Sequence, residues 1–171
     1  MVQHLSAVLL PTLLIVAAVS DVTSFRIPNW LTLLTAILFF PMALLSHMPL
    51  PEFGFHLLAG VGLFCVGFAA FQFNLFGGGD AKLMAAAGLW FGTSSLVPFL
   101  FTTAVVGGAL AFAVLIWSVI MVTWEIEGDT AALAGLGRKL RSLGPNVPYG
   151  FAFALGGILA FKDTWWMNAI Q

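Results

Sequence analysis

The sequence has few charged residues and a single cysteine. Charged residues make up 8% of the 171 positions and hydrophobic residues 61%, whereas soluble domains have about 25% charged residues. Only six Lys and Arg and a net charge of −1 leave no basic face for nucleic acid. The lone Cys65 excludes a disulfide within the chain and argues against a cysteine-based zinc site. We expect Cys65 to be a small buried hydrophobic residue.

Positive charge is also missing before the first apolar run, residues 5–19. A secretory signal peptide needs a positive region there, so we interpret this run as a retained transmembrane helix. Apolar runs then recur along the chain, at a mean hydropathy of +1.05, and leave no stretch for a sizeable soluble domain. The sequence therefore predicts one membrane domain over residues 1–171.

The apolar runs predict an all-α polytopic membrane protein with about six transmembrane helices. They cover residues 5–20, 30–46, 53–75, 81–92, 96–124 and 149–167. The fourth rises only about 18 Å, against a hydrocarbon core of about 30 Å. It must therefore start below the surface, tilt, or lie where the bilayer is thin.

The few cations predict the orientation in the bilayer. Five of the six fall on the side of the first, third and fifth connections: Arg26, Lys82, Arg138, Lys139 and Arg141. By the positive-inside rule this side is cytoplasmic, and both termini are non-cytoplasmic. Tryptophans are expected in aromatic belts, with Trp30 and Trp124 at the inner interface and Trp90, Trp165 and Trp166 at the outer one.

Two of the seven acids adjoin apolar spans beside segments that bend the chain. Asp21 lies in "SDVTSFRIPNW" after the first span, and Asp80 lies in "FGGGDAK" before the fourth, on the same predicted side. Acids at membrane depth are costly and usually functional. Alternatively, Asp80 caps the fourth helix, and Asp21 is a turn residue or pairs with Arg26. A cap does not need three preceding glycines, which suit positive φ or the close approach of an extended peptide.

Two carboxylates facing each other at low dielectric cannot both ionise easily, so they share a proton. One can then act as general base toward water and the other as general acid. Lys82 would favour an ionised carboxylate if it points toward one; otherwise it extends to the interface. The histidines, His4, His47 and His56, lie away from both acids without metal-ligand spacing, so no metal is expected.

At these residues the sequence resembles the type IV prepilin peptidases, which belong to the GxGD intramembrane aspartyl proteases. Residues 77–80 match GxGD, and "SDVTSFRIPNW" resembles the first-aspartate segment of that family, with Pro28 and Asn29. "NVPYGFAFALGG" resembles a third signature, which contains Pro148, Tyr149 and Gly150. The three signatures occur in order over nearly the whole chain.

The resemblance implies cleavage of the short cytoplasmic leader from prepilin or pseudopilin precursors in the bacterial inner membrane, by Asp21 and Asp80, without a cofactor. It implies that the other motif residues support the site: Gly77, Gly78, Gly79, Lys82, Pro28, Asn29, Pro148, Tyr149 and Gly150. The minimal architecture is similar to the tight-adherence (Flp) pilus branch. Bifunctional relatives carry paired cysteines in an N-terminal cytoplasmic region, so methyltransferase activity is not expected here.

Residues 125–148 are the one extended hydrophilic stretch. Leucines at helical spacing predict an amphipathic helix on the inner leaflet. Two other functions retain some support. A proton-coupled transporter also keeps intramembrane acids, but near the midplane and in two related halves; a scaffold for pilus assembly would need neither acid. The sequence predicts no oligomeric state.

Overall fold

The computed structural model describes residues 2–75, 77–125 and 149–168, and the regular structure of these residues is entirely helical. The predicted all-α fold is therefore confirmed. The helices are α1 (Val2–Ser24), α2 (Asn29–Leu45), α3 (Leu50–Gln72), α4 (Gly78–Phe91), α5 (Leu96–Glu125), α7 (Tyr149–Ala160) and α8 (Trp165–Asn168), with a 3-10 turn, η1, at Phe161–Asp163. The predicted amphipathic helix and Pro148 lie outside the described residues.

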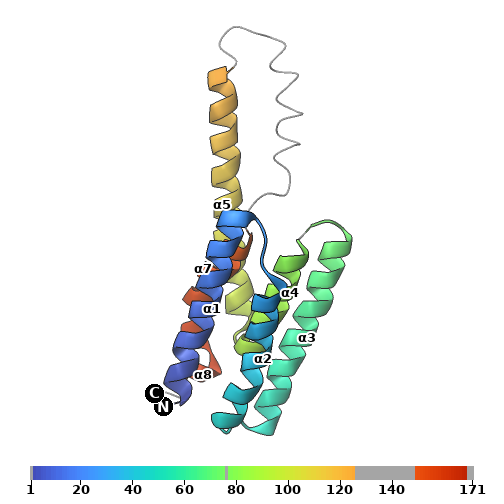
Figure 1. Ribbon diagram of the computed structural model, residues 1–171, viewed down its shortest axis with the longest axis vertical. Helices are drawn as coiled ribbons and strands as arrows, with labels where there is room; N and C mark the ends of the chain where they lie inside the picture. Colours follow the sequence, from blue (N-terminus) through green and yellow to red (C-terminus); the bar gives the residue numbers. More distant parts are fainter. Residues whose placement is uncertain (1, 76, 126–148, 169–171) are drawn as a thin grey trace.

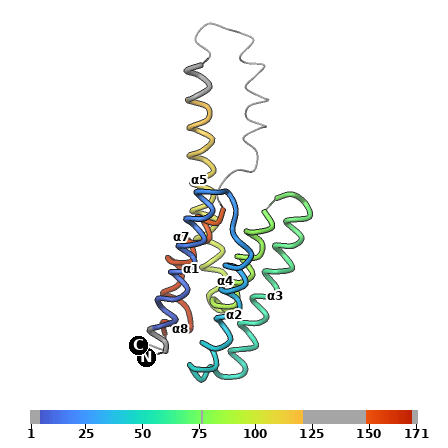
Figure 2. The backbone as a smooth tube through the Cα atoms, viewed as in Figure 1, coloured from blue at the N-terminus to red at the C-terminus, as the bar shows by residue number. Residues whose placement is uncertain are grey.

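The longer helices run alternately up and down as an antiparallel bundle (Figure 1). The start of α1 and α8 lie at one end of the molecule (Figure 1). The connections from α1 to α2 and from α3 to α4 lie toward the other end, where α5 projects beyond the other helices (Figure 2). The two motif segments that contain aspartate are therefore on the same side of the bundle.

Within the described part of the chain, three helices are long and apolar enough to cross a membrane: α1 over Leu5–Ser24, α3 over Leu50–Gln72 and α5 over Leu96–Ile120. Their outer faces carry many exposed large hydrophobic side chains, such as Val8, Leu58 and Phe112. Such a surface suits lipid rather than water. The fourth helix is short, as predicted: α4 has 14 residues and rises about 21 Å.

The last predicted span, 149–167, is wrong as one continuous helix. Helix α7 ends at Ala160, and η1 and α8 follow. The break lies at Lys162 and Asp163, where the Ser95 hydroxyl donates to the Asp163 carbonyl at 2.7 Å and the Thr164 hydroxyl donates to the Phe161 carbonyl at 2.6 Å. These bonds stabilise the turn because they satisfy carbonyls that a continuing helix would have used.

Helix α4 lies at the centre of the bundle. Leu83, Ala87 and Phe91 are fully buried, and α4 packs most closely against α3. Small residues form that interface: a Cβ added to Gly67 would lie 3.1 Å from the Ala81 Cα. Small side chains let helices approach closely within a membrane, where packing rather than the hydrophobic effect drives helix association.

The predicted outer aromatic belt is wrong for Trp90 and Trp166, both of which are fully buried. Their rings contact each other and Phe39, with ring centroids 5.3 to 6.1 Å apart. The Trp90 Nε1–H donates to the Thr35 carbonyl at 2.8 Å, and the Trp166 Nε1–H donates to the Trp90 carbonyl at 2.8 Å. Since α4 is an inner helix, its tryptophan finds a hydrogen-bond partner inside the protein instead of at the bilayer interface.

Cys65 also differs from its expected place, because it is exposed. Cys65 belongs to α3, a helix that lies at the outside of the bundle (Figure 1) and whose buried residues fall on one face. Its exposure follows from the position of α3, since an apolar outer face is compatible with lipid.

We predict that Trp90→Ala lowers the free energy of unfolding by about 3–5 kcal/mol, because it removes a large buried ring and leaves a cavity. Trp30, which is 60% exposed, is the matched control, and Trp30→Ala should change stability little. Thermal unfolding of both variants in detergent measures the difference. Equal losses of stability would contradict the inner position of Trp90.

Candidate active site

The segment after α1 turns sharply at its end. Asp21 lies in the last turn of α1, which continues to Ser24 and not only to residue 20 as predicted. Phe25 then adopts φ 50°, and the Ser20 hydroxyl donates to the Arg26 carbonyl at 2.9 Å. This turn brings the chain back against the bundle and leaves the Asp21 side chain buried, 5% exposed.

Helix α2 begins at the Ile-Pro-Asn segment. Pro28 occupies its N-cap position in an extended conformation, with φ −61° and ψ 137°, and Asn29 is the first helical residue. The Lys82 Nζ donates to the Asn29 Oδ1 at 2.8 Å. Lys82 therefore joins α4 to α2, and the described residues contain no ion pair between Lys82 and either aspartate.

The triple-glycine segment forms the start of α4. Gly77 is the N-cap of α4, and Gly78 and Gly79 form its first turn, so Asp80 is the third helical residue and not the cap. None of these glycines has positive φ. The reason for glycine at 79 is instead close approach: an added Cβ would lie 3.2 Å from the Cβ and 3.3 Å from the carbonyl oxygen of Ile27.

The two aspartates line one cavity of about 370 Å³. Its walls come from the turn after α1, the start of α2 and the start of α4: Asp21, Phe25, Arg26, Ile27, Pro28, Asn29, Gly77, Gly78, Gly79 and Asp80. The two carboxylates interact electrostatically across it. Both carboxylates and the glycine backbone line this cavity together with apolar side chains, so it can hold water and an extended peptide between two carboxylates.

The third motif also reaches this site, through the start of α7. The Gly150 N–H donates to the Asp21 Oδ2 at 2.7 Å, and the Phe151 N–H is also hydrogen bonded to this carboxylate. Tyr149, half-buried, is the residue before Gly150. The sequence predicted that this motif lies on the same side of the membrane as both aspartates. It did not predict that the backbone of the motif binds Asp21.

Three lining residues were not predicted from the sequence to line the site: Phe25, Arg26 and Ile27. They connect Asp21 to Pro28, and the short spacing between these two motif residues is the signal that could have identified them. The alternative that Arg26 pairs with Asp21 is not supported, since no such ion pair occurs among the described residues.

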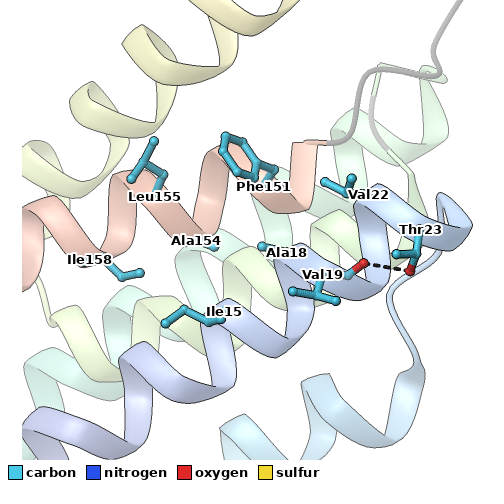
Figure 3. A pocket seen from close by; sticks show the side chains of 9 residues that line it. All are labelled: Ile15, Ala18, Val19, Val22, Thr23, Phe151, Ala154, Leu155 and Ile158. Atoms are coloured by element: carbon cyan, nitrogen blue, oxygen red, sulfur yellow. Dashed lines mark hydrogen bonds between the residues drawn. The ribbon is translucent and has the colours of Figure 1, made fainter.

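Two other hollows lie on the membrane-facing sides and contain no carboxylate. One of about 690 Å³ lies between α2, α3 and α4 and includes Lys82. The other, of about 420 Å³, lies between α1 and α7 and is lined by apolar side chains and Thr23, whose hydroxyl donates to the Val19 carbonyl at 2.7 Å (Figure 3). These surfaces suit acyl chains or an apolar helix rather than acid–base chemistry.

No histidine is among the described residues that line this cavity. His56 is fully buried, packs against Phe39 and Trp166, and lies 2.6 Å through Nδ1 from the Leu89 carbonyl. Within the described residues, no three His, Cys, Asp or Glu side chains come together as metal ligands.

Comparisons with known proteins support one family. No curated protein and no solved structure matches the chain. The sequence profile of the type IV leader peptidase family matches residues 8–124. This match includes both Asp21 and Asp80 and extends over more than half of the chain. The protein belongs to the type IV leader peptidase family.

Proposed function

We propose that this leader peptidase is an intramembrane aspartyl endopeptidase that uses Asp21 and Asp80 to remove the leader from prepilin or pseudopilin precursors. The observation that carries the proposal is the shared cavity: carboxylates from α1 and α4 line it together and interact electrostatically. Close carboxylates that share one proton form the acid–base pair of aspartic proteases.

The reaction needs one water molecule and no other reactant. One carboxylate takes a proton from the water, whose oxygen bonds to the carbonyl carbon of the scissile peptide, while the other carboxyl gives its proton to the carbonyl oxygen. A proton then passes to the amide nitrogen, the C–N bond breaks, and a carboxylic acid and an amine leave. The dyad returns to its initial state with one shared proton.

The surroundings of Asp80 support binding of an extended substrate. The first-turn N–H groups of a helix lack intrahelical partners, and Gly78 and Gly79 occupy that turn of α4 beside the cavity. Such groups can bind a peptide carbonyl or stabilise an oxyanion. A substrate helix must unwind before cleavage, since a helical peptide bond is shielded, and this backbone offers partners for the unwound segment.

The proposed site is at the cytoplasmic face of the bacterial inner membrane. Arg26 lines the cavity and Lys82 is in the first turns of α4, at the same end of the bundle, and cations mark the cytoplasmic side. A short cytoplasmic leader followed by an apolar helix fits this placement, and the proposed precursors include those of the tight-adherence (Flp) type. Family membership argues against a carrier or a scaffold.

We predict that Asp21→Asn and Asp80→Asn each reduce precursor cleavage in proteoliposomes by about 10²–10⁴-fold or more, because each removes an acid–base group. Asp163→Asn, an exposed acid in η1, is the matched control and should cleave normally. Full cleavage by either folded dyad variant would refute the assignment. Lost solute flux without lost cleavage would indicate a carrier.

We predict that Gly79→Ala and Gly77→Ala slow cleavage by about 10- to 100-fold through misplacement of Asp80. At Gly79 the added Cβ meets the backbone of Ile27, and at Gly77 it would lie 2.9 Å from the Asp80 Oδ2. The measurement is the cleavage rate per folded molecule.

Gly78→Ala is the control for these variants. Its Cβ would lie 3.4 Å from the ring of Phe71, an ordinary contact, so near-normal cleavage is expected. Normal rates in all three alanine variants would show that the glycines do not position Asp80.

We predict that EDTA leaves cleavage unchanged, because the dyad supplies both the acid and the base. The assay compares cleavage by the purified chain before and after chelation and dialysis. Loss of activity in EDTA that one divalent ion restores would contradict a metal-free mechanism.

A further inference from the structure

The two carboxylates of the cavity have different hydrogen-bond partners. The Asp21 carboxylate accepts hydrogen bonds from the N–H groups of Gly150 and Phe151. These are the second and third residues of α7, whose N–H groups a capping side chain normally satisfies. Asp21 therefore caps α7 from another helix, and the positive end of the helix dipole favours its negative form.

Asp80 has fewer donors. Its Oδ1 is buried and has no hydrogen-bond partner among the described residues. The backbone of Gly77 provides its hydrogen bond. An ionised carboxylate is acceptor-only, so a buried oxygen without a donor disfavours the charge, whereas a protonated carboxyl can donate through that oxygen.

We propose that the start of α7 fixes the resting proton of the dyad: Asp21 is the ionised general base, Asp80 is the protonated general acid, and Gly150 is a positioning residue for Asp21. The assignment rests on the proposed function. Two interacting carboxylates share one negative charge, and the charge resides where N–H donors stabilise it.

The assignment says which carboxylate gives or takes a proton in each step of the cleavage. Asp21 Oδ2 is engaged by the Gly150 N–H, so the other oxygen of Asp21 takes the proton from water. Asp80 gives its proton to the peptide carbonyl oxygen as the water oxygen bonds to the carbonyl carbon. After the C–N bond breaks, the proton on Asp21 has passed to the leaving amine, and Asp80 regains a proton from the diol intermediate.

Glycine at position 150 allows this contact. A Cβ there would lie 2.8 Å from the Asp21 Oδ2 and 2.8 Å from the Ile27 Cδ1, which real Cβ atoms do not approach. Gly150→Ala must therefore move either the carboxylate or the start of α7. Gly157 on the same helix is a matched position, since its Cβ would lie 2.8 Å from the end of the flexible Leu14 side chain, away from both acids.

Infrared difference spectroscopy of the full chain in an ester-free detergent at neutral pH locates the proton directly. We expect a deuterium-sensitive carboxylic acid C=O band in the unmodified protein that Asp80→Asn abolishes. Glu52 is a half-buried acid beside His56 that could also give a carboxylic acid band. Glu52→Gln is therefore the control and should leave the band in place. A band that persists in Asp80→Asn, or the absence of a band from the unmodified protein, would overturn the assignment.

Kinetics test the role of Gly150. We expect Gly150→Ala to lower kcat per folded molecule by about 10- to 100-fold with little change in KM, because a misplaced base acts on the chemical step. Gly157→Ala should keep kcat within about threefold. Equal kcat values in the two variants would overturn the positioning role.

The outcomes of the infrared and kinetic experiments can be told apart from the outcomes that test the proposed peptidase function. The infrared band needs no cleavage assay and remains informative if Gly150→Ala fails to fold. Full cleavage by Asp21→Asn and Asp80→Asn would refute the peptidase dyad wherever the proton resides, whereas a persistent band in an inactive Asp80→Asn would refute only the proton assignment.

Discussion

The hydrogen bond of 2.7 Å from the Gly150 N–H to Asp21 joins the end of α1 to the start of α7, and much of the architecture depends on it. At membrane depth an unsatisfied carboxylate and the free N–H groups of a helix start are each costly. Here the N–H groups at the start of α7 donate to the Asp21 carboxylate, so both the donors and the acceptor have hydrogen-bond partners. The contact aligns α7 along α1 (Figure 3), and α7 in turn holds α5, through the Thr102 hydroxyl that donates to the Gly156 carbonyl at 2.9 Å.

The second constraint is the position of α4 along the axis of the bundle. This short helix is fixed at both ends: Gly79 lies against Ile27 at the start, and Trp90 donates to Thr35 near the end. The small-residue interface with α3 holds it between them. Asp80, the proposed acid, is therefore carried by a buried, well-packed helix, which positions a side chain more accurately than a loop does. The cavity that contains both carboxylates lies at the start of this helix.

Three helix starts surround the two carboxylates. Asn29 begins α2 and Gly78 begins α4, and both line the cavity, while the start of α7 binds Asp21. Helix N-termini carry partial positive charge and free N–H donors. Their convergence favours negative charge on the carboxylates, while Lys82 joins α4 to α2 through Asn29 and, among the described residues, forms no ion pair with either aspartate.

The sequence was enough to predict the helical membrane fold, because the apolar runs that form helices are a local property. The few cations and the three motifs were enough to predict that Asp21 and Asp80 lie at one end of the bundle, because the direction of each successive helix follows from the order of the runs. The sequence did not predict that Asp80 lies inside a helix, that Trp90 faces the core, that α7 stops at Ala160, or that the α7 backbone binds Asp21. These features depend on the rotation and depth of each helix relative to its neighbours. Packing between residues far apart in the chain sets both, so only the tertiary structure decided which donors each carboxylate receives.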